Sequence, residues 1–581
     1  LLDSRPIFSA LSGVYGIEQI PASMIERVEV MRGGGSALFG SSAIAGTINI
    51  ITKEPMRNSG MLSHTITGIG DGDVFDNSTA LNASLVTDDQ RAGLYIFGQN
   101  RHRSAYDHDG DGYSEIPKLH GQTIGFRSFL KTTTYSKLTF EYHHMEEFRR
   151  GGDLLNRPPH EANVAEQTEH SINGGGLKFD YFSPNENHRF NVFASAQHIN
   201  RDSYYGPGDR DPLDAYGNTT DLNWMAGSQY VYSFGKCIFM PSDLTAGIEF
   251  NQDKLEDNMW GYNRTVDQKV NIGSAFLQNE WKNDHWGFLI GGRLDKHNLI
   301  DHVIFSPRAN LRYNPTENIN LRFSYSSGFR APQAFDEDLH VENVGGNVAM
   351  VELADNLKEE RSQSLSASAD IYHRFGAFQV NFLVEGFYTK LSDVFALTDG
   401  EVVDGILTRT RHNASGAQVL GLTLEGKMAY LNKIQVQAGV TLQQSHYSKP
   451  HIWNKEAPAV KKMMRTPNTY GYFTATYTPI KPLSIALSGT YTGSMLVPHE
   501  PVPGFLENPI TVNTKDFFDI GLKAAYDFKL YKSMNLQLNA GIQNIFNAYQ
   551  DDFDKGADRD SGYIYGPSLP RSFFAGVKIS Y

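Results

Sequence analysis

Residues 534–542, MNLQLNAGI, alternate between apolar and polar side chains along most of their length. In an extended chain, Met534, Leu536 and Leu538 share one face, and the polar residues between them share the other. Residues 434–443, IQVQAGVTLQ, show the same split. A period of two is typical of a β-strand with an apolar environment on one side and a polar environment on the other.

The alternation continues to the end of the chain, and the connections between the runs are of two kinds. Short ones lie at 88–89, 184–187, 283–284, 314–318 and 481–482, and long ones lie between them at 151–170, 335–360 and 452–466. Short turns on one rim and long loops on the other are typical of an outer-membrane barrel, whose apolar face meets lipid and whose polar face lines the lumen. A soluble β-sandwich also alternates, but it holds far fewer strands.

We therefore predict an all-β fold, a transmembrane antiparallel β-barrel of about 22 strands, a size at which the lumen is plugged. The final residues 571–581, RSFFAGVKISY, support this prediction. Phe573, Val577 and Tyr581 share the apolar face of a last strand that ends on an aromatic residue. This ending resembles the recognition signal of the barrel-assembly machinery.

Composition and charge exclude several classes of protein. The 581 residues carry a formal net charge of -13 and hold no basic stripe, so no nucleic-acid partner is expected. No stretch approaches the roughly 18 apolar residues of a membrane helix, which excludes a helical membrane protein. A single cysteine, Cys237, rules out a disulfide framework. Because the chain opens like the middle of a domain, we expect further residues, including any Ton box, upstream of Leu1.

Residues 25–53, IERVEVMRGGGSALFGSSAIAGTINIITK, have a different, glycine-rich composition. They resemble the end of the plug domain of TonB-dependent outer-membrane receptors, with Gly34 where that family usually has proline. The resemblance implies a partial plug over residues 1–55, lying inside a barrel formed by residues 56–581. The residues that carry the motif are Glu26, Arg27, Glu29, Arg32, Gly33, Gly40 and Gly46.

The local pattern predicts that the glycines connect two short strands of a small sheet, one around Val28 and Val30 and one around Ile48 and Ile50. We interpret residues 33–35 as close packing, since a phosphate cradle needs a following helix and a Lys-Ser/Thr pair that the sequence lacks. The resemblance further implies that the plug charges pair with charges on the barrel wall. Such pairs fix register.

A second set of motifs brackets the connection at 335–360. Phe329, Arg330 and Pro332 belong to the sequence FRAP, and Asn356 and Leu357 belong to a degraded Asn-Pro-x-Leu box. Both resemble boxes found in siderophore, cobalamin and haem receptors. We expect one box to end an outward strand and the other to precede the return strand, with a long outer loop between them.

The resemblance implies a receptor in the Gram-negative outer membrane, of a kind similar to the Bacteroidetes branch. It would import a metal chelate, a siderophore, cobalamin or haem, with energy from TonB and its inner-membrane complex, among lipopolysaccharide and with a surface lipoprotein as a further partner. No nucleophile elbow, zinc-protease helix or phosphate loop indicates an enzyme or a catalytic cofactor. A passive porin or an adhesin would not need the plug motif. A carbohydrate transporter of the same superfamily is the closer alternative, although those chains are usually far longer.

Candidate ligand contacts are mainly histidines and aromatic residues. In haem receptors of this type a histidine lies between the two boxes, and His340 lies there in this chain; neutral imidazole is a good haem-iron ligand. His143 and Met145 fall on the lumen side by parity, and His160 lies in an outer connection. The alternative for each of these side chains, and the more common case for such residues, is ordinary solvation or packing. For a cobalamin or a siderophore, aromatic loop tips would serve, and the sequence offers Tyr204, Tyr205, Tyr216, Trp453 and Tyr563.

Residues 107–115, DHDGDGYSE, place carboxylates at alternate positions. Asp107, Asp109 and Asp111, followed by a glycine, match the first half of a calcium loop. The twelfth position is Lys118 instead of the usual glutamate, so Glu115 is the candidate that completes the ligand set. The alternative is an acidic turn with no ion. We expect bound calcium to stiffen this outer loop.

Overall fold

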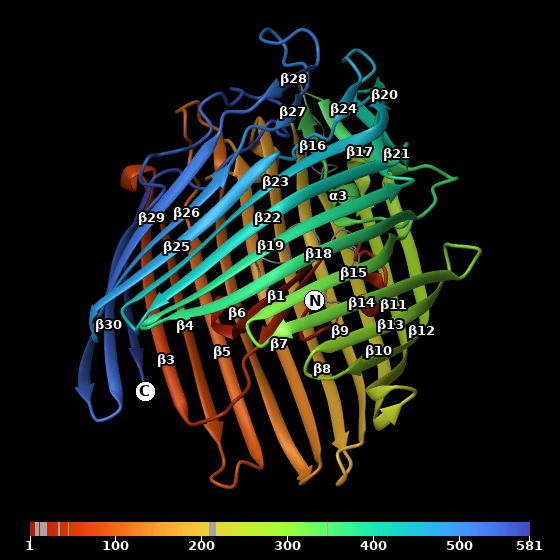
Figure 1. Cartoon of the computed structure of the whole chain (residues 1–581). Helices are drawn as coiled ribbons and strands as arrows, with labels where there is room; N and C mark the ends of the chain where they lie inside the picture. Colours follow the sequence, from red (N-terminus) through yellow and green to blue (C-terminus); the bar gives the residue numbers. More distant parts are fainter. Residues whose placement is uncertain (6–10, 12–19, 33–34, 45, 208–215, 345–346) are drawn as a thin grey trace.

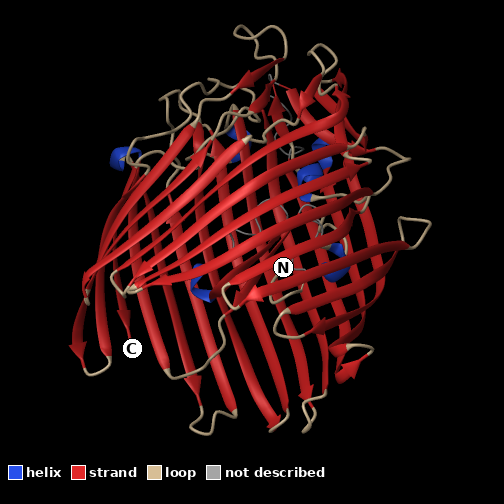
Figure 2. Cartoon of the chain, viewed as in Figure 1, coloured by secondary structure: helices blue, strands red, loops and turns tan. Residues whose placement is uncertain are grey.

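The computed structural model describes residues 1–5, 11, 20–32, 35–44, 46–207, 216–344 and 347–581. Within these residues, strands that follow one another in the chain pair side by side into a closed antiparallel barrel of 22 strands (Figures 1 and 2). The strands are β3 (Ser59–Ile69), β4 (Val74–Val86), β5 (Ala92–Arg103), β6 (Ser114–Thr133), β7 (Ser136–Gly152), β8 (Val164–Phe182), β9 (His188–Pro207), β10 (Tyr216–Cys237), β11 (Met240–Met259), β12 (Arg264–Lys282), β13 (Trp286–His297), β14 (Ile304–Thr316), β15 (Ile319–Arg330), β18 (Glu360–Phe375), β19 (Phe378–Ser392), β22 (Ala417–Tyr430), β23 (Ile434–His451), β25 (Thr469–Ile480), β26 (Leu483–Thr492), β29 (Phe517–Tyr531), β30 (Met534–Gln543) and β31 (Ser572–Ser580).

The last strand closes the ring. β31 pairs with β30 on one side and with the first barrel strand, β3, on the other, with Ile66 opposite Ala575. Every backbone group of a closed barrel has a neighbouring strand, so no open edge meets lipid. The predicted 22-stranded antiparallel barrel is confirmed.

The two faces of the wall have opposite character. On β30 and β31 the apolar set points outward, with Leu538 47% and Phe573 43% exposed. The same holds on β22 and β23, where Leu422 and Leu442 are exposed while their lumen-facing neighbours Thr423 and Thr441 are buried and hydrogen-bonded to each other at 3.0 Å. The alternation therefore separates lipid from lumen, as the pattern predicted.

Short turns occupy one rim because their residues satisfy the backbone locally. At the turn between β12 and β13, Asn283 Oδ1 accepts hydrogen bonds from the N–H groups of His285 and Trp286, at 2.9 and 2.6 Å. At the turn between β4 and β5, Asp89 Oδ1 accepts from the N–H of Arg91 at 3.1 Å. Asparagine and aspartate favour such turns for this reason.

The opposite rim carries the long loops and most of the smaller elements (Figure 1). One connection is shorter than expected: β7 runs to Gly152 and β8 begins at Val164, so the predicted loop at 151–170 is confined to residues 153–163. The smaller elements of this rim are η2 (Gly70–Gly72), η3 (Pro159–Glu161), η4 (Trp260–Tyr262), α3 (Asp336–Leu339), β24 (Val460–Lys462), the hairpin β27 (Leu496–His499) and β28 (Ile510–Asn513), and a sheet of β16 (Glu342–Val344), β17 (Asn347–Leu353), β21 (Ile406–Asn413) and β20 (Phe395–Val403).

The described part of the first 52 residues lies inside the barrel. It holds η1 (Ala22–Met24), β1 (Ile25–Arg32), α2 (Ser36–Phe39) and β2 (Gly46–Thr52), and β1 pairs antiparallel with β2. η1 contacts β4 and β5, whereas α2 contacts β13, β14 and β15 across the bore. The two predicted strands are thus present. The one-turn helix α2 between them was not expected, and Gly33 and Gly34 lie outside the described residues.

All helices in the described ranges are short, and none could cross a membrane.

Candidate functional site

A cavity of 250 Å³ opens among the long loops. Its walls come from the outer ends of β6, β8 and β9, from the connection between β15 and β18, and from the connection between β30 and β31. These segments are far apart in sequence and meet only because the barrel closes. Residues that line the cavity include Tyr113, Glu166, Tyr205, His340, Glu342 and Tyr563.

Four predicted ligand residues gather at this cavity or directly behind it. The His340 ring meets Tyr205 edge-on, with 5.1 Å between ring centroids, and His340 Nε2 lies 3.9 Å from a Glu166 oxygen. Tyr204 packs edge-on against Tyr216 at 4.9 Å. His160 Nδ1 is 2.9 Å from the Tyr216 hydroxyl. The structure thus places His340, Tyr204, Tyr205 and His160 in one cluster of aromatic side chains.

The aromatic residues are not loop tips, which corrects the prediction. Tyr204 and Tyr205 belong to β9 and are each 1% exposed, within a cluster that includes Met259, Val341 and Val348. The loops fold back over the barrel mouth, and burial of aromatic area stabilises that arrangement.

Of the three other proposed loop tips, Tyr216 begins β10 and the remaining two are also buried. Trp453 and Tyr563 are 7% and 3% exposed, and Tyr563 stacks on His499 with 3.7 Å between ring centroids.

Two further predicted residues do not reach the cavity. The side chains of His143 and Met145 on β7 face the barrel interior, as parity predicted, but both are buried by packing. Met145 lies in an apolar cluster with Leu11 and Leu339. His143 fills the space beside Gly174, where a Cβ would lie 2.4 Å from Nε2.

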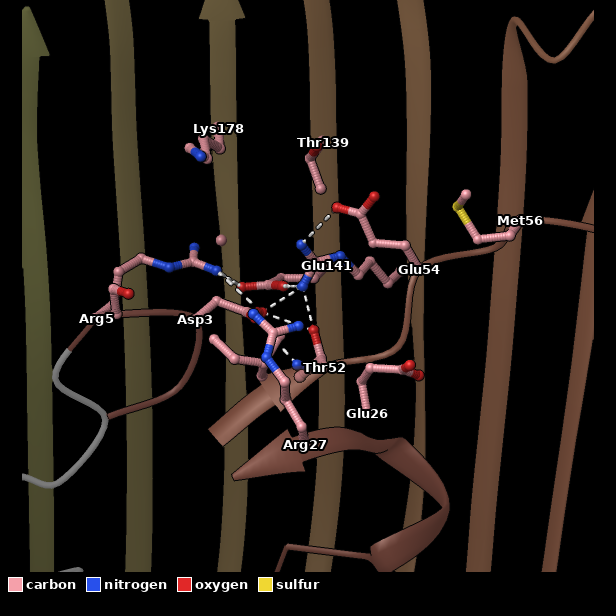
Figure 3. Close-up of a pocket in the computed structure, with 14 residues that line it drawn as sticks. Asp3, Arg5, Glu26, Arg27, Thr52, Glu54, Met56, Thr139, Glu141 and Lys178 are labelled. Carbon is pink, nitrogen blue, oxygen red and sulfur yellow. Dashed lines mark hydrogen bonds and ion pairs between the residues drawn. The ribbon is translucent and has the colours of Figure 1, made fainter. Parts of the chain in front are cut away.

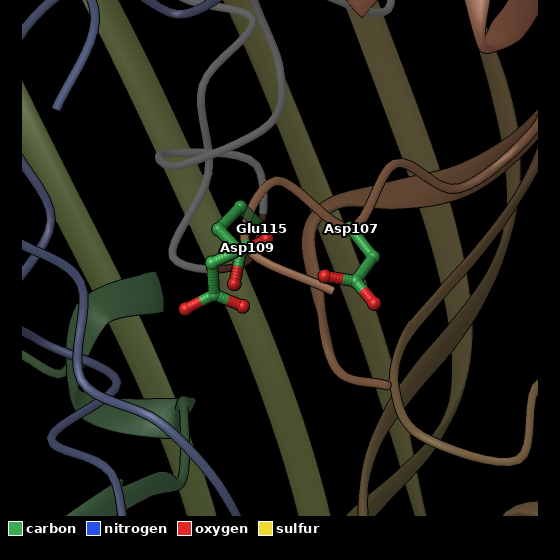
Figure 4. Close-up of side chains that lie close together, drawn as sticks. All are labelled: Asp107, Asp109 and Glu115. Carbon is green, nitrogen blue, oxygen red and sulfur yellow. The ribbon is translucent and has the colours of Figure 1, made fainter. Parts of the chain in front are cut away.

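The acidic loop brings three of its four predicted metal ligands together (Figure 4). Oxygens of Asp107, Asp109 and Glu115 all lie within 4.8 Å of one another. Asp111 turns away, because its carboxylate accepts hydrogen bonds from Arg559 Nη2 at 2.7 Å and from the Gly556 N–H at 2.8 Å. Burial opposes its ionisation, but the backbone hydrogen bonds and Arg559 outweigh burial and lower the pKa of Asp111.

The plug motif contacts the wall through Arg32. Arg32 Nη1 lies 2.7 Å from Glu385 on β19, and Nη2 lies 2.8 Å from Glu425 on β22. Arg27 pairs at 2.8 Å with Glu29 of its own strand. Glu26 and Arg27 line a polar cavity of 440 Å³ at the short-turn end of the bore.

That polar cavity holds a charge network that the sequence did not single out. Asp3, Glu141 and Thr52 converge from three segments (Figure 3). Arg127 of β6 contacts Asp3 and Thr52 and lies 3.3 Å from Glu141, and Arg5 also contacts Glu141. One signal was available: Glu141 shares the lumen parity of His143. The partners of a lumen charge, however, come from remote segments.

The glycines of the motif allow close approach. Gly40 has a φ of 77°, and a Cβ there would lie 3.1 Å from Arg293 Nη2 on β13. At Gly46 a Cβ would meet the Met31 carbonyl oxygen of the paired strand at 2.8 Å. A larger residue at position 40 would push the plug away from β13, and one at position 46 would push β2 away from β1.

The first box motif, FRAP, contacts the plug loop, which here means residues 35–44 between β1 and β2. The Phe329 N–H donates to Ser36 Oγ at 3.0 Å, and the Phe329 carbonyl accepts from the Ser42 N–H at 2.8 Å. Arg330, at the end of β15, contacts Glu337 and lies 3.8 Å from the centroid of the Phe335 ring.

The box residues lie where the sequence placed them around the outer loop. Pro332 follows the end of β15, and Asn356 and Leu357 form a turn before β18, in which the Leu357 N–H donates to the Ala354 carbonyl at 3.1 Å.

A plugged barrel of this size, with a cavity among its outer loops, defines the class of outer-membrane receptors. The family described as "TonB dependent receptor-like, beta-barrel" matches residues 60–545, and the TonB-dependent receptor plug domain matches residues 1–47. The chain belongs to the TonB-dependent receptor family, whose members are outer-membrane proteins.

Curated relatives include an "Iron-regulated outer membrane virulence protein" of Vibrio cholerae, 26% identical over 353 residues, which cover 57% of this chain and 49% of the relative. The vitamin B12 transporter BtuB of Vibrio vulnificus is 23% identical over 349 residues, which cover 58% of this chain and 52% of that protein. The matched region therefore spans about half the length of these curated relatives.

Solved structures share the fold. The siderophore receptor PirA of Acinetobacter baumannii superposes with a TM-score of 0.79 at 17% identity, covering 100% of this chain and 90% of that chain. A ferric enterobactin receptor (PfeA) mutant from Pseudomonas aeruginosa gives a TM-score of 0.77 at 16% identity, with the same coverage. At these identities the likeness establishes the architecture alone.

Proposed function

We propose that this protein imports a bulky metal chelate, a siderophore, cobalamin or haem, across the outer membrane, and that TonB and its inner-membrane complex supply the energy. The observation that carries the proposal is the position of the outer cavity, which lies among the long loops above a bore that the plug occupies. A ligand bound there would be separated from the periplasm by residues 1–52 until the plug moves. Arg32 and its two wall carboxylates are candidates for contacts that break during that motion.

The proposal assigns binding and transport to the chain, with no chemical step and no catalytic cofactor. Lipopolysaccharide would surround the outward apolar and aromatic face. A surface lipoprotein that covers the long loops belongs to the carbohydrate-transporter alternative, and pull-down of such a partner together with glycan binding would favour it.

The test is ligand binding by the purified protein, titrated separately with haem, cyanocobalamin and ferric siderophores. We expect saturable binding of at least one of these, and loss of affinity when Tyr205 is replaced by alanine, since Tyr205 packs behind His340 at the cavity. If the protein binds none of them, the proposal of chelate uptake is refuted.

Haem is a second candidate because His340 lines the cavity. A shift of the Soret band on mixing with haem, lost in His340→Ala, would place haem first. The matched control is His120→Ala, because His120 is exposed on β6 and does not line the cavity. An unchanged Soret band in His340→Ala would exclude His340 as the iron ligand.

We further propose that calcium binds the acidic loop through Asp107, Asp109 and Glu115 and stiffens it. The proximity of their oxygens supports a hard cation with oxygen ligands. Calcium should raise the melting temperature of the wild-type protein, and Asp109→Ala should abolish that rise. Asp111→Ala should keep it, since the Asp111 carboxylate does not belong to this group of oxygens and is turned toward Arg559 and the Gly556 N–H. Identical melting curves with calcium and with chelator would refute the site.

A further inference from the structure

The outer cavity is lined by more acidic than basic groups. Among the described lining residues there are two guanidiniums, and each already has a carboxylate partner: Arg149 Nε lies 2.8 Å from Glu147, and Arg559 lies 2.7 Å from Asp111 and 3.1 Å from Glu115. The carboxylates of the lining are Glu115, Glu166, Glu342, Asp554 and Asp560.

The two most exposed charged side chains of the lining are carboxylates, whereas Glu115 and Asp554 are each only 2% exposed. The side chains of Glu166 and Glu342 are 44% and 43% exposed, whereas those of Arg149 and Arg559 are 10% and 14% exposed. A ligand that enters the cavity therefore meets these two carboxylates first. The two guanidiniums are more buried and are paired, and Glu342 is itself paired with Arg409 at 3.2 Å.

The aromatic rings at the cavity are already engaged. The face of an aromatic ring attracts cations through its quadrupole, but Tyr205 and Tyr563 are 1% and 3% exposed and Tyr563 stacks on His499. Arg559 already uses one such face, with its guanidinium 4.6 Å from the centroid of the Tyr113 ring.

A second cavity, beside the plug, has the same character. This cavity of 360 Å³ lies between the plug loop and β10 to β13, and its lining includes Glu249, Asp253 and Arg293. Arg293 is the basic residue of the described lining, and it lies 2.6 Å from Glu249 and 2.8 Å from Asp295. A polyanion would have to displace a paired carboxylate at each level to gain a cationic partner.

We propose, on the basis of the chelate uptake inferred above, that the chelate taken by this protein carries no net negative charge, which ranks haem, with its two propionates, behind cobalamin and the neutral or cationic siderophores. Placing like charges side by side in a partly desolvated cavity disfavours a polyanion, and opposite charge or neutrality avoids that cost. Neutral and cationic chelates are thus the substrate class. Polyanionic ferric catecholates are excluded, although a ferric enterobactin receptor shares the fold.

The test compares chelates of different charge on the purified full chain by fluorescence quenching. The probes are ferrioxamine B, which is cationic, ferrichrome and cyanocobalamin, which are neutral, and ferric enterobactin, a trianion. We expect binding of at least one cationic or neutral probe, with ferric enterobactin about a hundredfold weaker or worse. Glu166→Gln with Glu342→Gln should weaken the cationic probe about tenfold and should strengthen ferric enterobactin.

The matched control is Glu317→Gln, which removes an exposed carboxylate in the short turn between β14 and β15 and should leave all affinities unchanged. Ferric enterobactin binding as tightly as a neutral probe would overturn the charge inference while leaving chelate uptake intact. Binding of none of the four probes, nor of haem, would overturn both.

Discussion

Arg32 reaches from plug strand β1 to carboxylates on β19 and β22, so one side chain ties the plug to two wall strands. Its side chain is 47% exposed, so solvent screens the pairs. The contribution of these pairs is therefore small against the whole fold. It matters because it acts at the boundary between two parts that must separate if the plug moves.

Replacing Arg32 with alanine should loosen the plug without unfolding the barrel. We expect amide exchange in β1 and β2 to quicken about fivefold, equivalent to about 1 kcal/mol of lost local stability. Hydrogen exchange with mass spectrometry measures this. Arg27→Ala is the matched control, because Arg27 pairs with Glu29 of the plug strand itself and its loss should quicken exchange in β1 and β2 less. Equal effects of the two variants would show that the wall pairs do not hold the plug.

Two serines in the plug loop should differ sharply when the hydroxyl is removed. Ser36 Oγ accepts the buried Phe329 N–H, so Ser36→Ala strands a buried donor and should cost about 1 to 3 kcal/mol locally. Ser41 Oγ has no hydrogen-bond partner among the described residues, so Ser41→Ala should change local stability by less than about 0.5 kcal/mol. Exchange protection of the Phe329 amide is the readout, and its persistence in Ser36→Ala would contradict the assignment.

At the scale of elements, Arg409 on β21 joins the outer loops into one unit. Its guanidinium lies 3.0 Å from Asp399 on β20, 3.2 Å from Glu342 at the start of β16 and 2.9 Å from Glu500 after β27. Asn454 also donates to Glu500, at 2.9 Å. The cavity wall at Glu342 is thereby linked to three other connections, which explains why the loops pack as a cap.

The loop cap should be less stable at high pH. Burial, opposed in part by Arg409, raises the pKa of Glu500 to about 7, above its usual value of 4.5. Between these values the folded form holds a proton that the unfolded form releases, so stability falls as pH rises through 7. Burial raises the pKa of Asp560 as well, and this adds an effect of the same sign.

The measurement compares the melting of wild type with that of Glu500→Gln. The two should coincide near about pH 5, and near about pH 8 the variant should be more stable by on the order of 1 to 2 kcal/mol, since glutamine cannot ionise. A constant difference across the range would show that Glu500 does not titrate in the folded loops.

At the scale of the molecule, the barrel exists only when its last strand meets its first. The Tyr581 N–H donates to the Gly60 carbonyl at 2.9 Å, and the Gly60 N–H donates back at 3.2 Å. The Tyr581 side chain is 63% exposed, on the outward face where aromatic residues favour the membrane interface.

Removing the terminal aromatic ring should reduce barrel closure and insertion. We expect Tyr581→Ala to lower the yield of folded protein several-fold, measured as the heat-modifiable band on gels. Tyr531→Ala is the control, because Tyr531 is equally exposed, at 64%, but lies at the end of β29, away from the closure. Equal yields would show that the terminal ring does not assist assembly.

The sequence alone determined the local properties of this protein. Alternation along residues such as 534–542 sets which side of a strand meets lipid, because successive side chains point to opposite faces. The asparagines and aspartates of the short turns set one rim, and the motif at 25–53 indicated the plug. Each of these signals depends on residues close together in the chain.

Only the tertiary structure decided the site. His340, Tyr205 and Tyr563 come from three segments far apart in the chain, and parity cannot say which segments meet over the mouth of a closed ring. The same reason placed Asp111 on Arg559, across 448 residues, instead of beside the oxygens of Asp107, Asp109 and Glu115. The sequence of such long loops does not determine whether they point outward or inward. Burial of their aromatic and charged side chains against one another fixed them inward.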